Sequence, residues 1–452
     1  MKKIAILVFF TVGFFVHVWA CTGLIAGKQA TVDGSVLVTY SADSHTLYGA
    51  LTSSPAADWP KGSMRSIVEW DTNKPLGEIE QVEHTYAVIG NMNEHQLTVV
   101  ESTWGGRPEL VDTTGIIDYG SLMQLALERA KTAREAIKVM TGLVKKYGYY
   151  SSGESFTIAD PNEAWILDLI GKGPGRRGAV WVAVRIPDDC IAGHANYPRI
   201  HKIPMDDKEN CLYSPDVISF AREMGYFDGL NKDFSFARAY LPADFGALRA
   251  CDARVWSFFR KYDSTMDNYL PYVNGESAEP FPLYVKPSRK LSVQDMKEAM
   301  RDHFEDTPFD MTQDVGAGPF KVPYRFRPMS FEVDGKSYCM ERAIATQQTG
   351  FTLVGQMRNW LPDPVGGVLW FGVDDANTCV YIPMYCGITQ VPECFSPENG
   401  SMYDFSWTSA FWIHNWVANM AYARYEPMIG DIRKVQSAVE TSLNLRQPAV
   451  DK

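Results

Sequence analysis

The first twenty-one residues place the strongest constraint on this chain. Met1-Lys2-Lys3 is a short basic segment, residues 4–20 are almost entirely apolar, and Val18-Trp19-Ala20 puts small side chains at positions −3 and −1 before Cys21. This order is typical of a secretory signal peptide, and the apolar stretch is too short for a comfortable membrane span. We therefore expect residues 1–20 to be removed. The mature chain, residues 21–452, would be exported to the periplasm or the cell exterior with Cys21 at its N-terminus.

A cysteine directly after a signal peptide has a second interpretation. Bacterial lipoproteins are acylated at such a cysteine, usually after Leu at −3 and a small residue at −2. Here −3 is Val18 and −2 is the bulky Trp19, which fit poorly. Lipidation would consume both the thiol and the α-amine of Cys21. A surface binding protein anchored through Cys21 and a catalytic Cys21 are therefore mutually exclusive.

The remaining composition is that of a globular protein, with 46% hydrophobic and 21% charged residues. The formal net charge is −11 and no Lys/Arg-rich run is present, so nucleic acid is not an expected partner. The eight cysteines form no CxxC pair and no HExxH motif occurs, so we expect no metal and no other cofactor. In an exported chain the cysteines at 379, 386 and 394 could form a bridge or remain buried thiols. A homo-oligomer is compatible with the sequence.

Hydrophobic periodicity predicts groups of strands alternating with pairs of helices. The chain should enter a hairpin at once, with strands over 21–27 and 35–40 joined at Asp33-Gly34. Further strands are expected at 86–90, 97–101, 155–159, 164–170, 180–185, 351–354, 367–372 and 378–384. Helices are expected at 120–130, from a capping box at Thr132, and at 291–304, 407–425 and 431–444, with irregular structure over 206–246. This pattern predicts an α+β fold, in which layered sheets are covered by helices, as one large domain over residues 21–452.

Cys21 has the features of an N-terminal nucleophile. A thiol attacks as the thiolate, and a free cysteine is only slightly ionised near neutral pH. The α-amine that signal cleavage would release has a reference pKa of about 8, so one residue can supply both nucleophile and base, directly or through one water. The attacked carbonyl then becomes an oxyanion, which fixed donors such as Asn side chains or backbone N–H groups must stabilise.

At this point the sequence resembles a known family, the cysteine dipeptidases of family C69. The resemblance covers most of the mature chain and rests on motifs in order: Cys21-Thr-Gly-Leu-Ile-Ala-Gly27, Asp33-Gly34-Ser35, Tyr40-Ser-Ala-Asp43, Gly90-Asn-Met-Asn-Glu94, Leu127-Glu-Arg-Ala-Lys-Thr-Ala-Arg-Glu-Ala136, Ile158-Ala-Asp-Pro-Asn-Glu-Ala-Trp165, His194-Ala-Asn196 and Trp360-Leu-Pro362. Family C69 belongs to the N-terminal nucleophile hydrolases, alongside penicillin V acylases and bile salt hydrolases. The resemblance implies a four-layer αββα sandwich and a dipeptidase that cleaves short peptides through an acyl-enzyme.

The resemblance also implies roles for five residues. Cys21 matches the nucleophile, and Asp43 matches an acid that orients the N-terminal amine. Asn93 matches an oxyanion donor, and Asn196 matches a second amide that positions the amine or the substrate. Arg254 matches a distal arginine that supports the nucleophile. Each of the last four has a plainer interpretation, as a turn residue for Asp43, Asn93 and Asn196 and as a structural ion pair for Arg254.

One position departs from the family pattern. Relatives carry Arg three residues before the aspartate, where this chain has Tyr40. A tyrosine cannot lower the thiol pKa by a positive charge, although its hydroxyl can hydrogen-bond. An acyl-amide hydrolase of the same fold, like penicillin V acylase or bile salt hydrolase, therefore stays open beside the dipeptidase. His194 and His414 are expected to be structural histidines rather than ligands.

Overall fold

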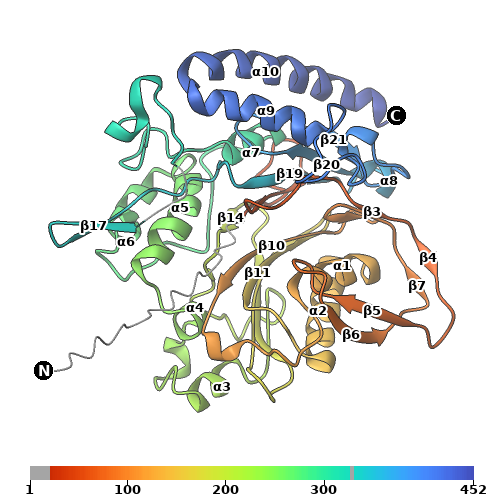
Figure 1. Cartoon of the computed structure of the whole chain (residues 1–452). Coiled ribbons are helices and arrows are strands. Elements are labelled where there is room, and N and C mark those ends of the chain that lie inside the picture. The colour runs from red at the N-terminus through yellow and green to blue at the C-terminus, as the bar shows by residue number, and fades with distance from the viewer. Residues whose placement is uncertain (1–20, 326–329) are drawn as a thin grey trace, which may run out of the picture.

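The computed structural model describes residues 21–325 and 330–452, so the predicted signal peptide lies outside the described residues. Two large antiparallel sheets form its centre (Figure 1). Within the described residues, the first sheet has seven strands in the order β16 (Tyr284–Val285), β14 (Ile191–His194), β1 (Thr22–Ala26), β2 (Val36–Asp43), β19 (Thr349–Met357), β20 (Gly367–Val373) and β21 (Ile382–Tyr385). The second has eight, in the order β15 (Cys211–Tyr213), β13 (Ala179–Ile186), β12 (Ala164–Gly171), β11 (Gly153–Ala159), β10 (Thr98–Gly105), β9 (Met92–Asn93), β8 (Val88–Ile89) and β3 (Ser53–Ser54).

The chain enters the first sheet directly after Cys21. β1 pairs with β2 on one side, where Gly23 lies opposite Tyr40, and with β14 on the other side. The predicted hairpin is confirmed, and its turn places Gly34 at φ +86°, a conformation that glycine adopts without strain. Because β1 is hydrogen-bonded along both edges, the backbone directly after Cys21 is held in place.

Alternate side chains along the strands face opposite layers, as the period of a strand requires. Ile25 lies in the apolar core between the two sheets, whereas Leu24 and Ala26 pack toward helices on the other face. In the second sheet Ile166 joins the core between the sheets, and Trp165 packs toward the helices that cover that sheet. Each sheet is therefore buried on both faces.

Helices cover the outer faces of both sheets (Figure 1). α1 (Tyr119–Arg129) and α2 (Ala133–Tyr147) pack on the eight-stranded sheet. α5 (Ala253–Arg260), α7 (Val293–Met300) and α10 (Tyr425–Val450) contact the seven-stranded sheet, and α9 (Ala410–Ala423) lies beside α10. The predicted α+β class is confirmed.

The helix ends follow the capping signals in the sequence. The Thr132 hydroxyl accepts a hydrogen bond from the Glu135 backbone N–H at the start of α2, while the Glu135 carboxylate accepts from the Lys131 N–H rather than from that of Thr132. Ser292 forms a complete capping box with α7. That helix ends at Met300, before the predicted residue 304, because the chain turns away and Phe304 adopts φ +64°.

The connections hold features that periodicity did not predict. β5 (Met64–Val68) pairs with β6 (Pro75–Glu80), and β4 (Ala57–Asp58) pairs with β7 (His84–Thr85), as two-stranded ribbons outside the large sheets (Figure 1). The segment 206–246 contains the short helices α3 (Val217–Glu223) and α4 (Phe236–Tyr240). The cysteines whose side chains are described are free thiols: Cys21, Cys190, Cys211, Cys251, Cys379, Cys386 and Cys394. No helix within residues 21–325 and 330–452 is long and apolar enough to cross a membrane.

Candidate active site

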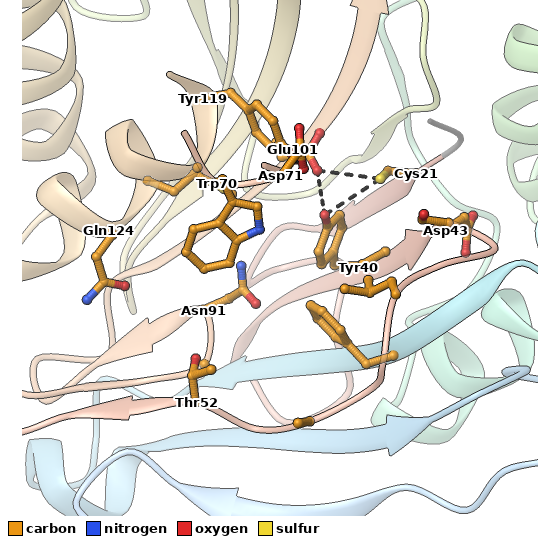
Figure 2. Close-up of a pocket in the computed structure, with 18 of the residues that line it drawn as sticks. Cys21, Tyr40, Asp43, Thr52, Trp70, Asp71, Asn91, Glu101, Tyr119 and Gln124 are labelled. Carbon is orange, nitrogen blue, oxygen red and sulfur yellow. Dashed lines mark hydrogen bonds between the residues drawn. The ribbon is translucent and has the colours of Figure 1, made fainter. Parts of the chain in front are cut away.

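Cys21 lies in the wall of a cavity of about 310 Å³. The wall is formed by β2 and the loop after it, the middle of β10, the turn between β5 and β6, α1, and single residues of β19 and β20. Figure 2 shows Cys21, Tyr40 and Glu101 close together at one side of this cavity, with Trp70, Asn91 and Gln124 further along it. Among the described residues that line it there is no Lys, Arg or His. The cavity is therefore a site of apolar, hydroxyl, amide and carboxylate groups.

The Cys21 thiol contacts a tyrosine and a glutamate. Cys21 is 4% exposed, and its Sγ lies 3.6 Å from Tyr40 Oη and donates to Glu101 Oε1 at 3.4 Å. The Tyr40 hydroxyl donates to the same Glu101 oxygen at 2.5 Å. Burial raises the pKa of the Cys21 thiol well above its ordinary value, and the negative charges of Glu101 and Asp43 raise it further. The thiol is therefore held protonated in this arrangement, and attack requires a base.

Asp43 ends β2 beside the nucleophile. Its carboxylate accepts hydrogen bonds from Thr349 Oγ1 at 2.7 Å and Ser41 Oγ at 3.2 Å and forms a buried ion pair with Arg342. The Asp43 backbone N–H also hydrogen-bonds toward the Cys21 sulfur, which opposes the rise in the thiol pKa. Asp43 is thus held in place in the same cavity wall as Cys21, and Arg342 balances its negative charge.

Arg254 joins the Cys21 backbone to Asn196. The guanidinium is 1% exposed, and Nη1 donates to the Cys21 carbonyl and to Thr22 Oγ1, both at 2.8 Å. Nη2 donates to Asn196 Oδ1 at 2.8 Å and to the Ala195 carbonyl at 3.1 Å. Burial lowers the pKa of Arg254 to about 10, so the side chain stays charged at neutral pH. The structure therefore brings Cys21, Asn196 and Arg254 into one network.

Asn196 is held in the left-handed region, at φ +58°. Its Nδ2 donates to the Thr103 carbonyl at 2.6 Å, and its backbone N–H donates to Ser102 Oγ at 3.2 Å. The side chain thus ties β10 of the second sheet to the start of β1 in the first. The turn-residue interpretation holds for its backbone, and the side chain adds a link to the nucleophile through Arg254.

Asn93 is placed differently. Its Nδ2 donates to the Leu127 and Ala130 carbonyls at 2.7 and 2.8 Å, and its Oδ1 accepts from the His95 and Leu97 N–H groups at 3.0 and 3.1 Å. These bonds engage both amide hydrogens in holding the end of α1 to the β9–β10 turn, away from the cavity. The geometry gives no support to the oxyanion role expected for Asn93, which stays a prediction from the resemblance.

The amide in the cavity wall belongs to Asn91, two residues earlier. Its Nδ2 donates one hydrogen bond to the Val99 carbonyl at 3.0 Å. An amide nitrogen carries two hydrogens, so Asn91 retains one for a ligand. Figure 2 shows this side chain below Trp70 and to the left of Tyr40. Asn91 was within the quoted Gly90–Glu94 motif but was not selected from the sequence.

Two carboxylates of the cavity were also missed from the sequence. Glu101 comes from β10, where a single acidic residue ends an apolar predicted strand, and Asp71 comes from the β5–β6 turn. Glu154 is buried beside Glu101, and burial together with the Glu101 charge raises the pKa of Glu154 well above its ordinary value. Burial and the neighbouring Glu101 therefore favour the protonated form of Glu154.

The buried histidine nearest this network is structural. His194 lies between Ser102 Oγ, 2.6 Å from Nδ1, and Thr157 Oγ1, 2.8 Å from Nε2. Burial lowers its pKa to about 3, and burial lowers that of His414 to about 4, so both stay neutral. In the described part of the chain, no group of three or more His, Cys, Asp or Glu side chains could hold a metal ion.

Comparison with known proteins agrees with this geometry. The chain is 24% identical over 429 residues to "Probable dipeptidase" of Latilactobacillus sakei, which covers 90% of this chain and 82% of that protein. It is 26% identical over 396 residues to "Probable dipeptidase" of Salmonella dublin, covering 82% and 81% of the two chains. "Dipeptidase A" of Lactobacillus helveticus is 24% identical over 429 residues, with coverage of 90% and 82%. The pattern of peptidase family C69 matches residues 20–438. The chain therefore belongs to peptidase family C69 and is a hydrolase of peptide bonds.

Proposed function

We propose that this protein is an exported cysteine dipeptidase whose nucleophile is Cys21, freed at the N-terminus by signal cleavage. The observation that carries the proposal is the position of Cys21, with its carbonyl held by buried Arg254 and its side chain in the wall of a cavity. A cavity of about 310 Å³ is at the small end of the range for ligand sites, which favours a substrate of very few residues. The names of the relatives support the same substrate class.

The arrangement of layers fits this proposal. Two facing sheets with helices on both outer faces correspond to the αββα sandwich of N-terminal nucleophile hydrolases, with residues 21–452 as one domain. In such an architecture the first strand carries the nucleophile at its leading end. β1 begins at Thr22, so Cys21 occupies that place.

The proposed chemistry uses the α-amine of Cys21 as the base. The amine takes the proton from Sγ, Sγ attacks the carbonyl carbon of the scissile peptide bond, and an electron pair moves to the carbonyl oxygen. The resulting ammonium then protonates the leaving amine as the C–N bond breaks, and an aminoacyl thioester forms on Cys21. Water loses a proton to the same amine and attacks the thioester, releasing the amino acid and restoring the thiol.

Fixed groups would support each step. Arg254 and Asn196 hold the Cys21 backbone, and Asp43 provides a nearby carboxylate for the α-ammonium. The Asn91 amide is the side-chain donor best placed in the cavity for the oxyanion. Because the thiol pKa is raised, transfer of its proton and attack are expected to occur together.

The test compares chains that differ only at the N-terminus. Protein beginning at Cys21 should hydrolyse dipeptides, whereas protein beginning at Ala20 should be inactive because its Cys21 nitrogen is an amide. Cys21→Ala in the shorter chain should also be inactive. Full activity of the chain that retains Ala20, verified by mass spectrometry, would exclude the self-base mechanism.

An acyl-amide hydrolase of the same fold is the second candidate. The apolar wall favours it, because Leu47, Phe351 and Phe371 line the cavity and could contact an acyl chain. Phe351 and Phe371 stack at 5.5 Å between ring centroids, and Phe351 packs edge-on against Tyr40 at 5.7 Å. The two candidates differ in whether the substrate has a free amine beside the scissile carbonyl.

A further inference from the structure

The cavity has an acidic end next to the nucleophile. Glu101 and Asp71 both line it, and Figure 2 shows them with Tyr119 on the same side as Cys21. The Tyr119 hydroxyl donates to Asp71 Oδ1 at 2.9 Å. Asp43, the third carboxylate of the wall, is compensated by Arg342. Within residues 21–325 and 330–452, neither Glu101 nor Asp71 has a salt bridge to a basic side chain.

Glu101 has no basic side chain as a partner among the described residues. It is 2% exposed, and Oε1 accepts from both Tyr40 Oη and Cys21 Sγ. Its second oxygen, Oε2, is buried and accepts from no N–H or hydroxyl group of the described residues, and the neighbouring Glu154 carboxyl hydrogen-bonds with Glu101. A buried carboxylate without a counter-ion carries a large desolvation cost, so such groups are ordinarily paired or bind a ligand. Among the described residues that line the cavity there is no Lys, Arg or His side chain to pair with this carboxylate.

A dipeptide substrate carries a cation, its α-ammonium group, that can lie next to Glu101. The α-ammonium nitrogen is about 2.5 Å from the scissile carbonyl carbon, because a single Cα joins them. The sulfur approaches that carbon from about 3–3.5 Å. The ammonium is therefore within about 6 Å of Sγ before attack and closer afterwards, whatever the side chain. Glu101 Oε1 is itself 3.4 Å from Sγ, so the carboxylate and that ammonium would both lie beside the same sulfur atom.

We propose that Glu101, assisted by the charge of Asp71, binds the free α-ammonium of the substrate and restricts this enzyme to peptides with an unmodified N-terminus. The inference rests on the proposed function, since it assigns the acidic end of the Cys21 cavity. An N-acylated substrate puts a neutral amide where the ammonium would lie, and Glu101 then remains unpaired. A site whose buried polar group is left unpaired rejects such an analogue strongly.

The test uses L-alanyl-L-alanine and its N-acetyl derivative with protein beginning at Cys21. The measured quantity is the ratio of kcat/KM for the free dipeptide to that for the acetylated one. We expect a large ratio for the wild type and a fall of about ten- to a hundredfold in Glu101→Gln, the loss expected for one hydrogen bond to a charged group. Asp71→Asn should lower the ratio less, because Asp71 has no contact with Sγ. Glu83→Gln is the matched control, since Glu83 is exposed and does not line the cavity, and its ratio should stay within about twofold of the wild type.

The ratio separates amine recognition from a role of Glu101 in holding the thiol. If Glu101 only positions Cys21 and Tyr40, Glu101→Gln lowers kcat/KM for both substrates equally, and the inference is wrong. A wild-type ratio near one would also overturn it. If the wild type cleaves neither substrate, the proposed function fails, and binding to Cys21→Ala protein decides the inference by calorimetry. Preference for the free dipeptide that disappears with Glu101→Gln supports it, and equal binding of both peptides refutes it. Circular dichroism verifies that each variant is folded.

Discussion

Replacement of Arg254 by leucine removes the cation that supports the Cys21 backbone while keeping an apolar side chain of moderate size. In the native structure the guanidinium donates to the Cys21 and Ala195 carbonyls, Thr22 Oγ1, Asn196 Oδ1 and, through Nε, the Ala250 carbonyl one turn earlier. Leucine supplies none of these donors. The acceptors are enclosed, so water replaces the lost bonds only in part.

The cost follows from the number of acceptors left without a donor. An unsatisfied buried polar group costs about 1–3 kcal/mol. The Cys21 and Ala195 carbonyls and the Asn196 oxygen would together cost about 3–9 kcal/mol, offset by several kcal/mol because a buried charge is no longer desolvated. We expect Arg254→Leu to lose about 2–4 kcal/mol of unfolding free energy. Displacement of the nucleophile by about 1 Å would lower kcat by a factor on the order of 10².

Arg254→Lys is the matched comparison, since it keeps the charge but has three donors instead of five. The stability and activity of Arg254→Lys should lie between those of the wild type and those of Arg254→Leu. Urea unfolding and kcat for a dipeptide, measured on protein beginning at Cys21, provide the two readouts. An Arg254→Leu protein within about 1 kcal/mol of the wild type and with unchanged kcat would refute this account of the network.

The remaining predictions concern the cavity wall. Tyr40→Phe should lower kcat about tenfold or more by removing the hydroxyl shared with Glu101, whereas Tyr48→Phe should not, since Tyr48 lines the same cavity but its hydroxyl donates to the Asn399 carbonyl at 2.6 Å. Burial raises the pKa of Asp71 to about 6, so its charged form is lost as the pH falls through that value. A pH profile of kcat/KM for a free dipeptide should therefore decline below about pH 6, less steeply in Asp71→Asn, and identical profiles would count against the assignment. Asn91→Ala should lower kcat by about 10²–10³ with little change in stability, whereas Asn93→Ala should mainly lower the urea midpoint; the reverse pattern would restore the oxyanion role to Asn93.

Local features of this fold could be predicted from the sequence, because local interactions determine them. The hairpin at Asp33-Gly34 and the helix starts at Thr132 and Ser292 depend on residues a few positions apart. The pairing of β2 with β19 joins residues about three hundred positions apart, and no periodicity specifies that partner. The ribbon of β5 and β6 was missed because Ile67 and Ile79 are its only buried residues within the described strands, so its apolar pattern is weak.

Candidate site residues could be named from the sequence where a motif carries them, but which of them lie together depends on the folded chain. The structure places Arg254 against the Cys21 carbonyl, and the roles of both residues stay predictions. Asn91 and Asn93 belong to one motif, and only the turn geometry decides which amide reaches the cavity. Glu101 was not selected because it is the last residue of the predicted strand 97–101, where an acidic side chain is usually exposed to solvent.

The most direct test of the central claim is mass spectrometry of exported protein, intact and acid-quenched during turnover of a dipeptide. The account predicts an N-terminal peptide that begins at Cys21, with an unmodified α-amine at rest and an aminoacyl adduct on Cys21 during turnover. A diacylglyceryl group on Cys21, residues retained before it in active protein, or an adduct on another residue would contradict the account.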